Sequence, residues 1–278
     1  PTGSHQPGHE PHIDAQPLFR DEAPVDGSTW YLTNDWEHRD AGFEEIFHLV
    51  HDAGIGTYIQ GALPAYQRAL DREARAAIAD GRWGIPIDPG VGDWIAELEE
   101  EDSLAQEYIA SVLDTYYGLW GAFDDAPGGM WGIYTAKTRC ELLEKDPRGQ
   151  QLLEEFLPPM MHGYEALIDP SFQGEFLMYF DPDHLYTHKS QYYVDATLTG
   201  TRESKLRGNA ADNVLRGNDG NNVLCGGAGT DTAVFRGPRE EYRVERDGET
   251  IIVSDQVPDR DGTDRLIEIE AMRFADGS

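Results

Sequence analysis

Three consecutive nonapeptides run from Gly208 to Val234, and they constrain the fold more than any other part of the chain. Each begins with glycine, has asparagine or aspartate at its sixth position and has an apolar residue at its eighth. A degenerate copy precedes them at 199–207. Because glycine allows positive φ and close backbone approach, each copy predicts a tight turn followed by a short strand. The eighth residues would point inward from these strands: Leu206, Leu215, Leu224 and Ala233.

This pattern resembles the hemolysin-type (RTX) repeat, whose stacked copies form a parallel β-roll that binds Ca²⁺. The resemblance implies two nonapeptides per turn, with Asn213 stacked on Asp231 and Ser204 on Asn222. Calcium takes about six to eight oxygen ligands, from carboxylates and carbonyls. The ligands implied for this chain are Gly208, Ala210, Asn213, Asp219, Asn222, Gly226, Ala228 and Asp231.

Two of the three repeats have asparagine where the family usually has aspartate, so we expect one good calcium site and weaker ones beside it. After the repeats, short strands are expected around 233–235, 242–244, 251–253 and 266–270. Asp-Gly turns at 247–248 and 261–262 would separate them. The segment 261–277 resembles the cap that closes many such repeat domains, and a short repeat stack needs one.

The composition is strongly acidic, with 52 Asp and Glu against 22 Lys and Arg and a formal net charge of -30. This charge disfavours nucleic acid and anionic membranes as partners. No apolar run reaches transmembrane length. The two cysteines do not indicate a disulfide framework. The RTX resemblance implies export by type I secretion into a medium rich in calcium.

The remainder of the chain predicts an α+β multidomain protein. Residues 1–27, rich in Pro, His and Gly, are expected to form a flexible arm. Residues 28–197 are expected to form a helix-rich globular domain, and residues 198–278 the β-roll with its capping β-unit. Apolar periodicity and helix-stop signals predict helices within the middle domain at 44–53, 63–79, 91–120, 137–145 and 149–156, with 91–120 as one long helix or a pair of helices.

One of these helices carries a candidate transition-metal site. Glu44 and His48 are four residues apart and share a helix face, with Glu45 beside them. The segment resembles the zinc-peptidase motif His-Glu-x-x-His, with Glu44 in place of the first histidine. The resemblance implies Glu44 and His48 as metal ligands and Glu45 as the general base. The alternative is an acidic, solvated helix surface with no metal.

A second predicted helix would complete that site. Zinc peptidases of this type have a third ligand, a glutamate, on a later helix, and Glu107 matches it. Tyr116 or Tyr117 would then polarise a carbonyl. One imidazole and two carboxylates suit Fe²⁺, Mn²⁺ or a weaker Zn²⁺ site.

Two functions are compatible with these features. The first is a secreted calcium-binding module for extracellular adhesion or assembly, with calcium-dependent folding of its carboxy-terminal domain and self-association. The alternative is a secreted metal-dependent hydrolase that acts on peptides through the Glu-Glu-x-x-His site. The missing first histidine favours the module.

Overall fold

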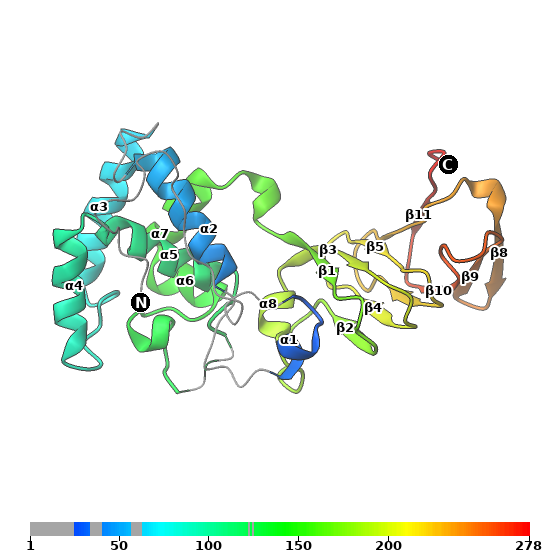
Figure 1. The fold of residues 1–278 in the computed structure, drawn as a ribbon, viewed down its shortest axis with the longest axis horizontal. Helices are drawn as coiled ribbons and strands as arrows, with labels where there is room; N and C mark the ends of the chain where they lie inside the picture. The colour runs from blue at the N-terminus through cyan, green and yellow to red at the C-terminus, as the bar shows by residue number, and fades with distance from the viewer. Residues whose placement is uncertain (1–24, 34–40, 57–62, 122, 124) are drawn as a thin grey trace, which may run out of the picture. The chain divides into compact units, whose positions relative to one another are not determined.

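The computed structural model describes residues 25–33, 41–56, 63–121, 123 and 125–278, and it divides into two compact units (Figure 1). The first unit lies within Trp36–Pro159, and the second combines residues of Pro24–Asp35 with Met160–Ser278. Most of the expected arm, residues 1–24, lies outside the described residues. The expected boundary at 197/198 falls inside the second unit, because strands on both sides of it pair with one another.

The first unit is built from helices packed around one central helix. The central helix is α5 (Leu104–Tyr116), in which every residue except Glu107 is buried. A helix buried all round needs partners on every side, and the neighbours of α5 provide them. These are α2 (Gly42–Val50), α3 (Pro64–Ala79), α4 (Gly90–Glu100), α6 (Arg139–Lys145) and α7 (Pro147–Phe156). Two short segments complete the unit, the π-helical η2 (His51–Gly56) and the 3-10 turn η3 (Met130–Gly132).

The helix boundaries follow local signals in the sequence. Of the two alternatives for 91–120, the structure has the pair of helices, α4 and α5, interrupted at Asp102, whose φ is 57°. Helix α3 ends before Gly81, which has a φ of 69° and supplies the left-handed residue of a helix end. Helix α7 begins with Asp146 as N-cap, which accepts a hydrogen bond from the Gly149 amide, and with Pro147 at its first position. The helix-rich character expected for this unit is therefore observed, with helix bounds that differ from the expected ones.

Asp146 also anchors the packing of the first unit. Its buried carboxylate accepts hydrogen bonds from Tyr108 and Tyr134, at 2.8 and 2.7 Å, and forms an ion pair with Arg82. A buried carboxylate is stable only when it is paired and hydrogen-bonded, and Asp146 meets both conditions. This cluster ties α5 and the start of α7 to Tyr134, which follows η3, and to Arg82, which follows α3.

The second unit is a roll of two sheets. One sheet is entirely parallel, in the order β1-β3-β5-β7-β11, and the other has the order β2-β4-β6-β10-β9-β8. The strands of the first sheet are β1 (Tyr164–Ile168), β3 (Tyr193–Leu198), β5 (Val214–Arg216), β7 (Thr232–Val234) and β11 (Ala271–Arg273). Those of the second are β2 (Glu175–Leu177), β4 (Lys205–Arg207), β6 (Val223–Cys225), β8 (Tyr242–Asp247), β9 (Thr250–Asp255) and β10 (Thr263–Ile267).

Successive repeat strands alternate between the two sheets, so two nonapeptides complete one turn. Leu206 of β4 pairs with Leu224 of β6, and Leu215 of β5 pairs with Ala233 of β7. All four side chains are fully buried between the sheets. The predicted β-roll and its inward-facing eighth positions are confirmed.

Both ends of the roll carry additional elements. Strands β10 and β11 continue the stack beyond β6 and β7, and the hairpin β8–β9 extends one sheet, as expected for a cap. At the amino-terminal end, α1 (Thr29–Thr33) and α8 (Thr187–Ser190) lie beside β1 and β2 (Figure 1). There the buried Lys189 forms an ion pair with Asp26 at 3.1 Å. The 3-10 turn η5 (Arg239–Glu241) belongs to this unit, and the boundary between the two units falls within the 3-10 turn η4 (Pro159–Met161).

Candidate calcium sites in the roll and a candidate metal centre

The stacked sixth positions of the repeats face one another inside the roll. The backbone N–H of Asn213 donates to Oδ1 of Asp231 at 2.8 Å, and the backbone N–H of Val223 donates to the Ser204 carbonyl at 3.1 Å. The first contact joins a pair that the repeat spacing predicts to be stacked, and the second joins Ser204 to the residue that follows its predicted partner, Asn222. The other carboxylate oxygen of Asp231, Oδ2, is buried and accepts no hydrogen bond from the described residues.

The surroundings of Asp231 are acidic. Burial raises the pKa of Asp231, and the negative charges of Glu270, Asp212 and Glu268 raise it further. Glu270 accepts a hydrogen bond from the Asp231 amide at 2.7 Å. A Cβ on Gly226 would overlap the Glu268 carbonyl oxygen and Oδ2 of Asp231, so only glycine fits there. Buried carboxylate and carbonyl oxygens gathered in this way have the chemistry that Ca²⁺ prefers.

The other expected calcium ligands are arranged differently. Gly208 lies against the Gly226 carbonyl, whereas Ala210 and Ala228 lie on exposed turns. Asp219 is turned outward and pairs with Arg236 at 2.8 Å. The structure therefore brings Gly208, Asn213, Gly226 and Asp231 together, and it leaves Asp219 outside this group.

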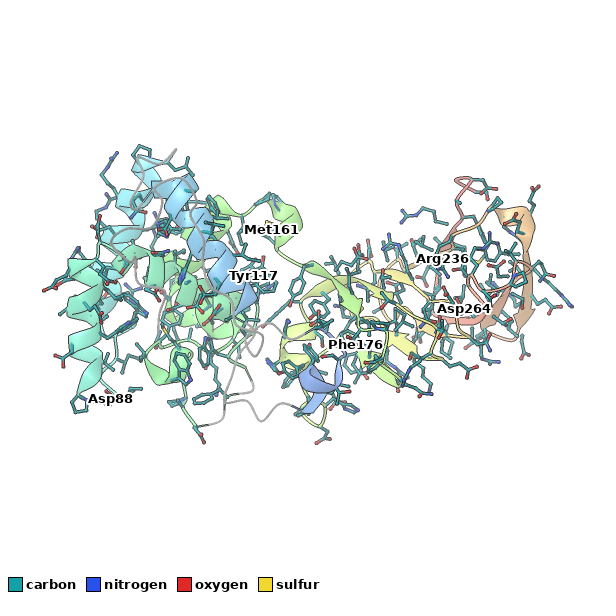
Figure 2. All side chains as sticks on the ribbon, in the orientation of Figure 1. Asp88, Tyr117, Met161, Phe176, Arg236 and Asp264 are labelled. Carbon is teal, nitrogen blue, oxygen red and sulfur yellow. The ribbon has the colours of Figure 1, made fainter. Side chains whose placement is uncertain are left out.

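Asp264 of the cap takes a position equivalent to a repeat aspartate, which sequence reasoning missed. Its Oδ1 accepts a hydrogen bond from the backbone N–H of Asn222 at 2.8 Å, as Oδ1 of Asp231 does from the backbone N–H of Asn213. Burial raises the pKa of Asp264 well above its usual value, and nearby Arg236 partly offsets this; both residues are labelled in Figure 2. The tripeptide Gly262-Thr263-Asp264 repeats Gly229-Thr230-Asp231, a signal that could have found it.

In the first unit, Glu44 and His48 of α2 meet Glu107 of α5. One potential ligand atom from each residue lies within 4.8 Å of the other two, and Glu44 and His48 are buried. Nε2 of His48 is 3.6 Å from Glu107, and Nδ1 is 3.7 Å from Glu45. The two carboxylates therefore lie at opposite nitrogens of the imidazole ring. Among the described residues, this is the one group of three such side chains.

The surroundings of His48 and His51 shift the pKa values of these two histidines in opposite directions. Burial lowers the pKa of His48, but Glu45 and the negative charges of Glu107 and Asp114 outweigh burial and raise it overall. His51 begins η2, and its Nε2 is 2.5 Å from Oε1 of Gln67. Burial lowers the pKa of His51 to about 4.

The structure does not bring Tyr116 to the Glu44, His48 and Glu107 cluster. Tyr116 lies nine positions after Glu107 on α5. This spacing corresponds to about 13 Å along the helix axis and to half a turn around that axis. The Tyr116 ring instead stacks under the guanidinium of Arg139, 3.9 Å from the ring centroid.

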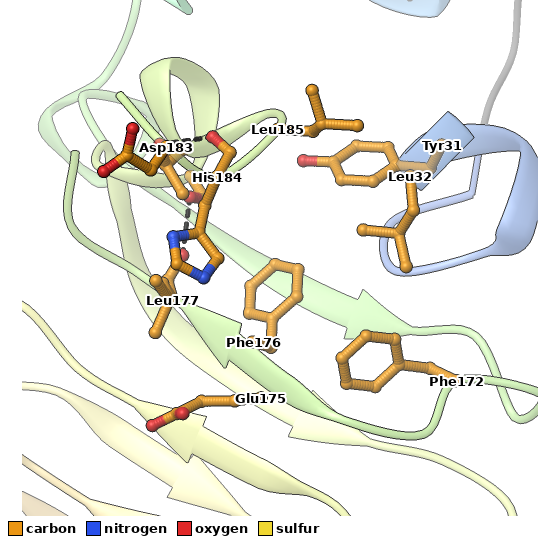
Figure 3. A pocket seen from close by; sticks show the side chains of 11 residues that line it. Tyr31, Leu32, Phe172, Glu175, Phe176, Leu177, Asp183, His184 and Leu185 are labelled. Carbon is orange, nitrogen blue, oxygen red and sulfur yellow. Dashed lines mark hydrogen bonds between the residues drawn. The ribbon is translucent and has the colours of Figure 1, made fainter. Parts of the chain in front are cut away.

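The second unit also contains a cavity of about 260 Å³, lined largely by apolar side chains (Figure 3). Phe172, Phe176 and Tyr31 form much of its wall, and His184 lies at its edge. His184 is exposed and pairs with Asp181 at 2.9 Å.

Comparison with protein families identifies one region. Residues 200–233 match the family model of the RTX calcium-binding nonapeptide repeat, in four copies. The carboxy-terminal part of the chain is thus of RTX type, and the degenerate copy at 199–207 is part of the repeat. RTX repeats bind calcium and are typical of secreted proteins. Comparisons with curated proteins and with solved structures found no match. No helix in the described part of the chain is long and apolar enough to cross a membrane.

Proposed function

We propose that the carboxy-terminal unit is a calcium-responsive module that orders outside the cell. The observation that carries this proposal is the buried Oδ2 of Asp231, which accepts no hydrogen bond from the described residues and lies among further acidic groups. A cation would neutralise this charge. Because Ca²⁺ would bind the folded roll and not the unfolded chain, binding stabilises the fold by mass action. Free calcium is low inside cells and high outside, so the roll would order after export.

Calorimetric titration of the intact chain with CaCl₂ tests this proposal. We expect saturable binding to the wild type, little response to MgCl₂, and loss of binding in Asp231→Asn. Asp247→Asn is the matched control, because it removes an exposed carboxylate from the same unit, and Asp247 is not among the acidic groups that act on Asp231. Absence of calcium binding by the wild type, or unchanged binding by Asp231→Asn, would contradict the proposal.

The role that we favour for this module is extracellular adhesion or assembly. The net charge of -30 supports it, because an acidic surface repels itself until divalent cations bridge or screen it. Self-association should then depend on calcium beyond the effect of ionic strength. Sedimentation at matched ionic strength, in CaCl₂ or NaCl, measures this, and identical distributions would rule out calcium-driven assembly.

A second candidate function is a divalent transition-metal centre at Glu44, His48 and Glu107. The convergence of ligand atoms from α2 and α5 within 4.8 Å supports it. A bound metal would supply Lewis-acid chemistry, and three protein ligands would leave coordination positions open for it. The donor set of one imidazole and two carboxylates favours Fe²⁺ or Mn²⁺ over a tight Zn²⁺ site.

Glu45 would have one of two roles at this centre: it orients His48, or it acts as the general base of a hydrolase. At 3.7 Å from Nδ1 of His48, its carboxylate is placed to orient the imidazole and raise its basicity. Glu45→Gln should then weaken metal binding by about 10–100-fold. In the hydrolase alternative, Glu45 acts as general base, and Glu45→Gln would abolish peptide hydrolysis while metal content stays unchanged.

Metal analysis of protein purified without chelator or nickel resin tests the centre itself. Near-stoichiometric iron, manganese or zinc is expected, lost in His48→Ala and retained in His184→Ala. His184 is a suitable control because its side chain is 58% exposed and outside the cluster. Calcium as the only bound metal would remove both the centre and the hydrolase alternative.

A further inference from the structure

The first two repeats differ from the third at two linked positions. Their second and sixth residues are both asparagine, Asn209 with Asn213 and Asn218 with Asn222. The third repeat has glycine and aspartate there, Gly227 and Asp231. The two changes occur together in both repeats.

The paired asparagines hydrogen-bond to each other. The backbone N–H of Asn209 donates to Oδ1 of Asn213 at 2.9 Å, and the side-chain Nδ2 of Asn213 donates to Oδ1 of Asn209 at 3.1 Å. The second pair does the same, with distances of 2.8 and 3.1 Å between Asn218 and Asn222. Neither pair adds a charge to the interior of the roll.

Their remaining donors bind carbonyls of the neighbouring turn. Nδ2 of Asn213 donates to the Val194 carbonyl at 2.8 Å, and Nδ2 of Asn209 to that of Tyr193 at 2.7 Å. In the second pair, Nδ2 of Asn218 donates to the carbonyls of Thr199 and Arg202, at 3.1 and 2.9 Å. Amide hydrogens thus take the place that a cation would have in satisfying inward-facing carbonyls, and buried polar groups need such partners.

The third repeat has no such substitute. Gly227 has no side chain, its φ is 99°, and the Asp231 carboxylate has no hydrogen to donate. Oδ2 of Asp231 remains without a hydrogen bond among the described residues, at full burial. The neighbouring groups come from the cap: the Glu268 carbonyl beside Gly226 and the Glu270 carboxylate.

We infer that the asparagine pairs hold the first two repeats together without metal, and that calcium acts at one place, where Asp231 meets the cap. The inference rests on the proposed function and narrows it. Calcium then controls the attachment of β11 and the segment before it to the repeat stack. The roll has a metal-free half and a calcium-dependent end.

Hydrogen exchange of the intact chain, resolved by segment, tests this inference in CaCl₂ and in chelator. Segments 205–216 should stay protected in both conditions. Segments 226–234 and 268–273 should gain protection only with calcium. Asp231→Asn should remove that gain, and Asp247→Asn should keep it.

The double variant Asn209→Gly/Asn213→Asp gives the reciprocal test, because it restores the glycine and aspartate of the third repeat. It should raise the calcium stoichiometry from one to two and make 205–216 calcium-dependent. Loss of protection across 205–216 of the wild type in chelator would overturn the inference while leaving the proposed function intact. A wild type that binds no calcium would overturn both.

Discussion

Replacing a carboxylate oxygen with an amide nitrogen changes what a buried side chain needs. Asn213 has donors and acceptors that neighbouring groups satisfy, whereas Asp231 at the stacked position has only acceptors. The first is complete without a cation, and the second gains from one. The same contrast applies in the helical unit, where the carboxylate of Asp146 is satisfied by protein donors alone.

Asp146 provides a stability prediction at this scale. Its carboxylate accepts from Tyr108, Tyr134 and Arg82 in a buried site. Asp146→Asn should destabilise the first unit by about 3 kcal/mol, because the Arg82 guanidinium and a tyrosine hydroxyl then lack their acceptor in a buried site. Asp80→Asn is the control, since this partner of Arg82 is 67% exposed and should cost less than about 1 kcal/mol. Urea unfolding measures both, and equal costs would contradict the account.

His51 provides a prediction about pH. Its pKa in the folded chain is about 4, against about 6.5 when unfolded, so the unfolded state takes up a proton first as pH falls. Its stability contribution is present above pH 6.5 and declines below it, by about 1 kcal/mol between pH 7.5 and 5.5. Urea unfolding of His51→Asn in chelator should lack this part of the pH dependence. His48→Asn should change it in the opposite direction, because the raised pKa of His48 favours the protonated form. Identical pH profiles for all three proteins would refute this assignment.

The sequence could predict part of the metal cluster for a geometric reason. Glu44 and His48 share a face because four residues nearly complete a helical turn. Tyr116 lies nine positions after Glu107, so the same helical period places these two residues on opposite faces of α5. That α5 packs Glu107 against α2 depends on tertiary contacts, which the helical period does not determine.

At the scale of elements, the repeats could be located from sequence because their register is periodic. The predicted stacking of Asn213 on Asp231 follows from that period, and so does the inward orientation of Leu206, Leu215 and Leu224. The sequence did not indicate that strands β1 to β3 belong to the roll, because the segments that connect them do not have the length of a nonapeptide repeat. Asp264 escaped for the same reason, since the β8–β9 hairpin separates it from Asn222, on which it stacks.

Gly226 tests whether the cap must pack closely on the repeats. Gly226→Ala would place a methyl group against the Glu268 carbonyl and the Asp231 carboxylate. We expect a cost of about 1–3 kcal/mol from overpacking, together with weaker calcium binding. Gly92→Ala in α4 is the control, because nothing lies within 4 Å of its added Cβ, and it should be neutral or slightly stabilising. Thermal unfolding distinguishes the two, and a neutral Gly226→Ala would contradict the tight junction.

At the scale of the whole molecule, the two units use different sources of stability. The helical unit buries α5 and satisfies its interior charge internally. The roll has short strands, a narrow apolar interior and an uncompensated carboxylate near its cap. The net charge of -30 adds repulsion that calcium would reduce. An exported chain of this kind would reach its full stability only where calcium is abundant.

Differential scanning calorimetry of the intact chain, with and without calcium, tests whether calcium stabilises the roll. Two transitions are expected, of which Asp146→Asn lowers the one that belongs to the helical unit. With calcium about a hundredfold above Kd, the other transition should rise by on the order of 10 °C, and Asp231→Asn should abolish the rise. A roll transition that does not move with calcium, or that moves equally in Asp231→Asn, would contradict the stabilisation of the roll by calcium at Asp231.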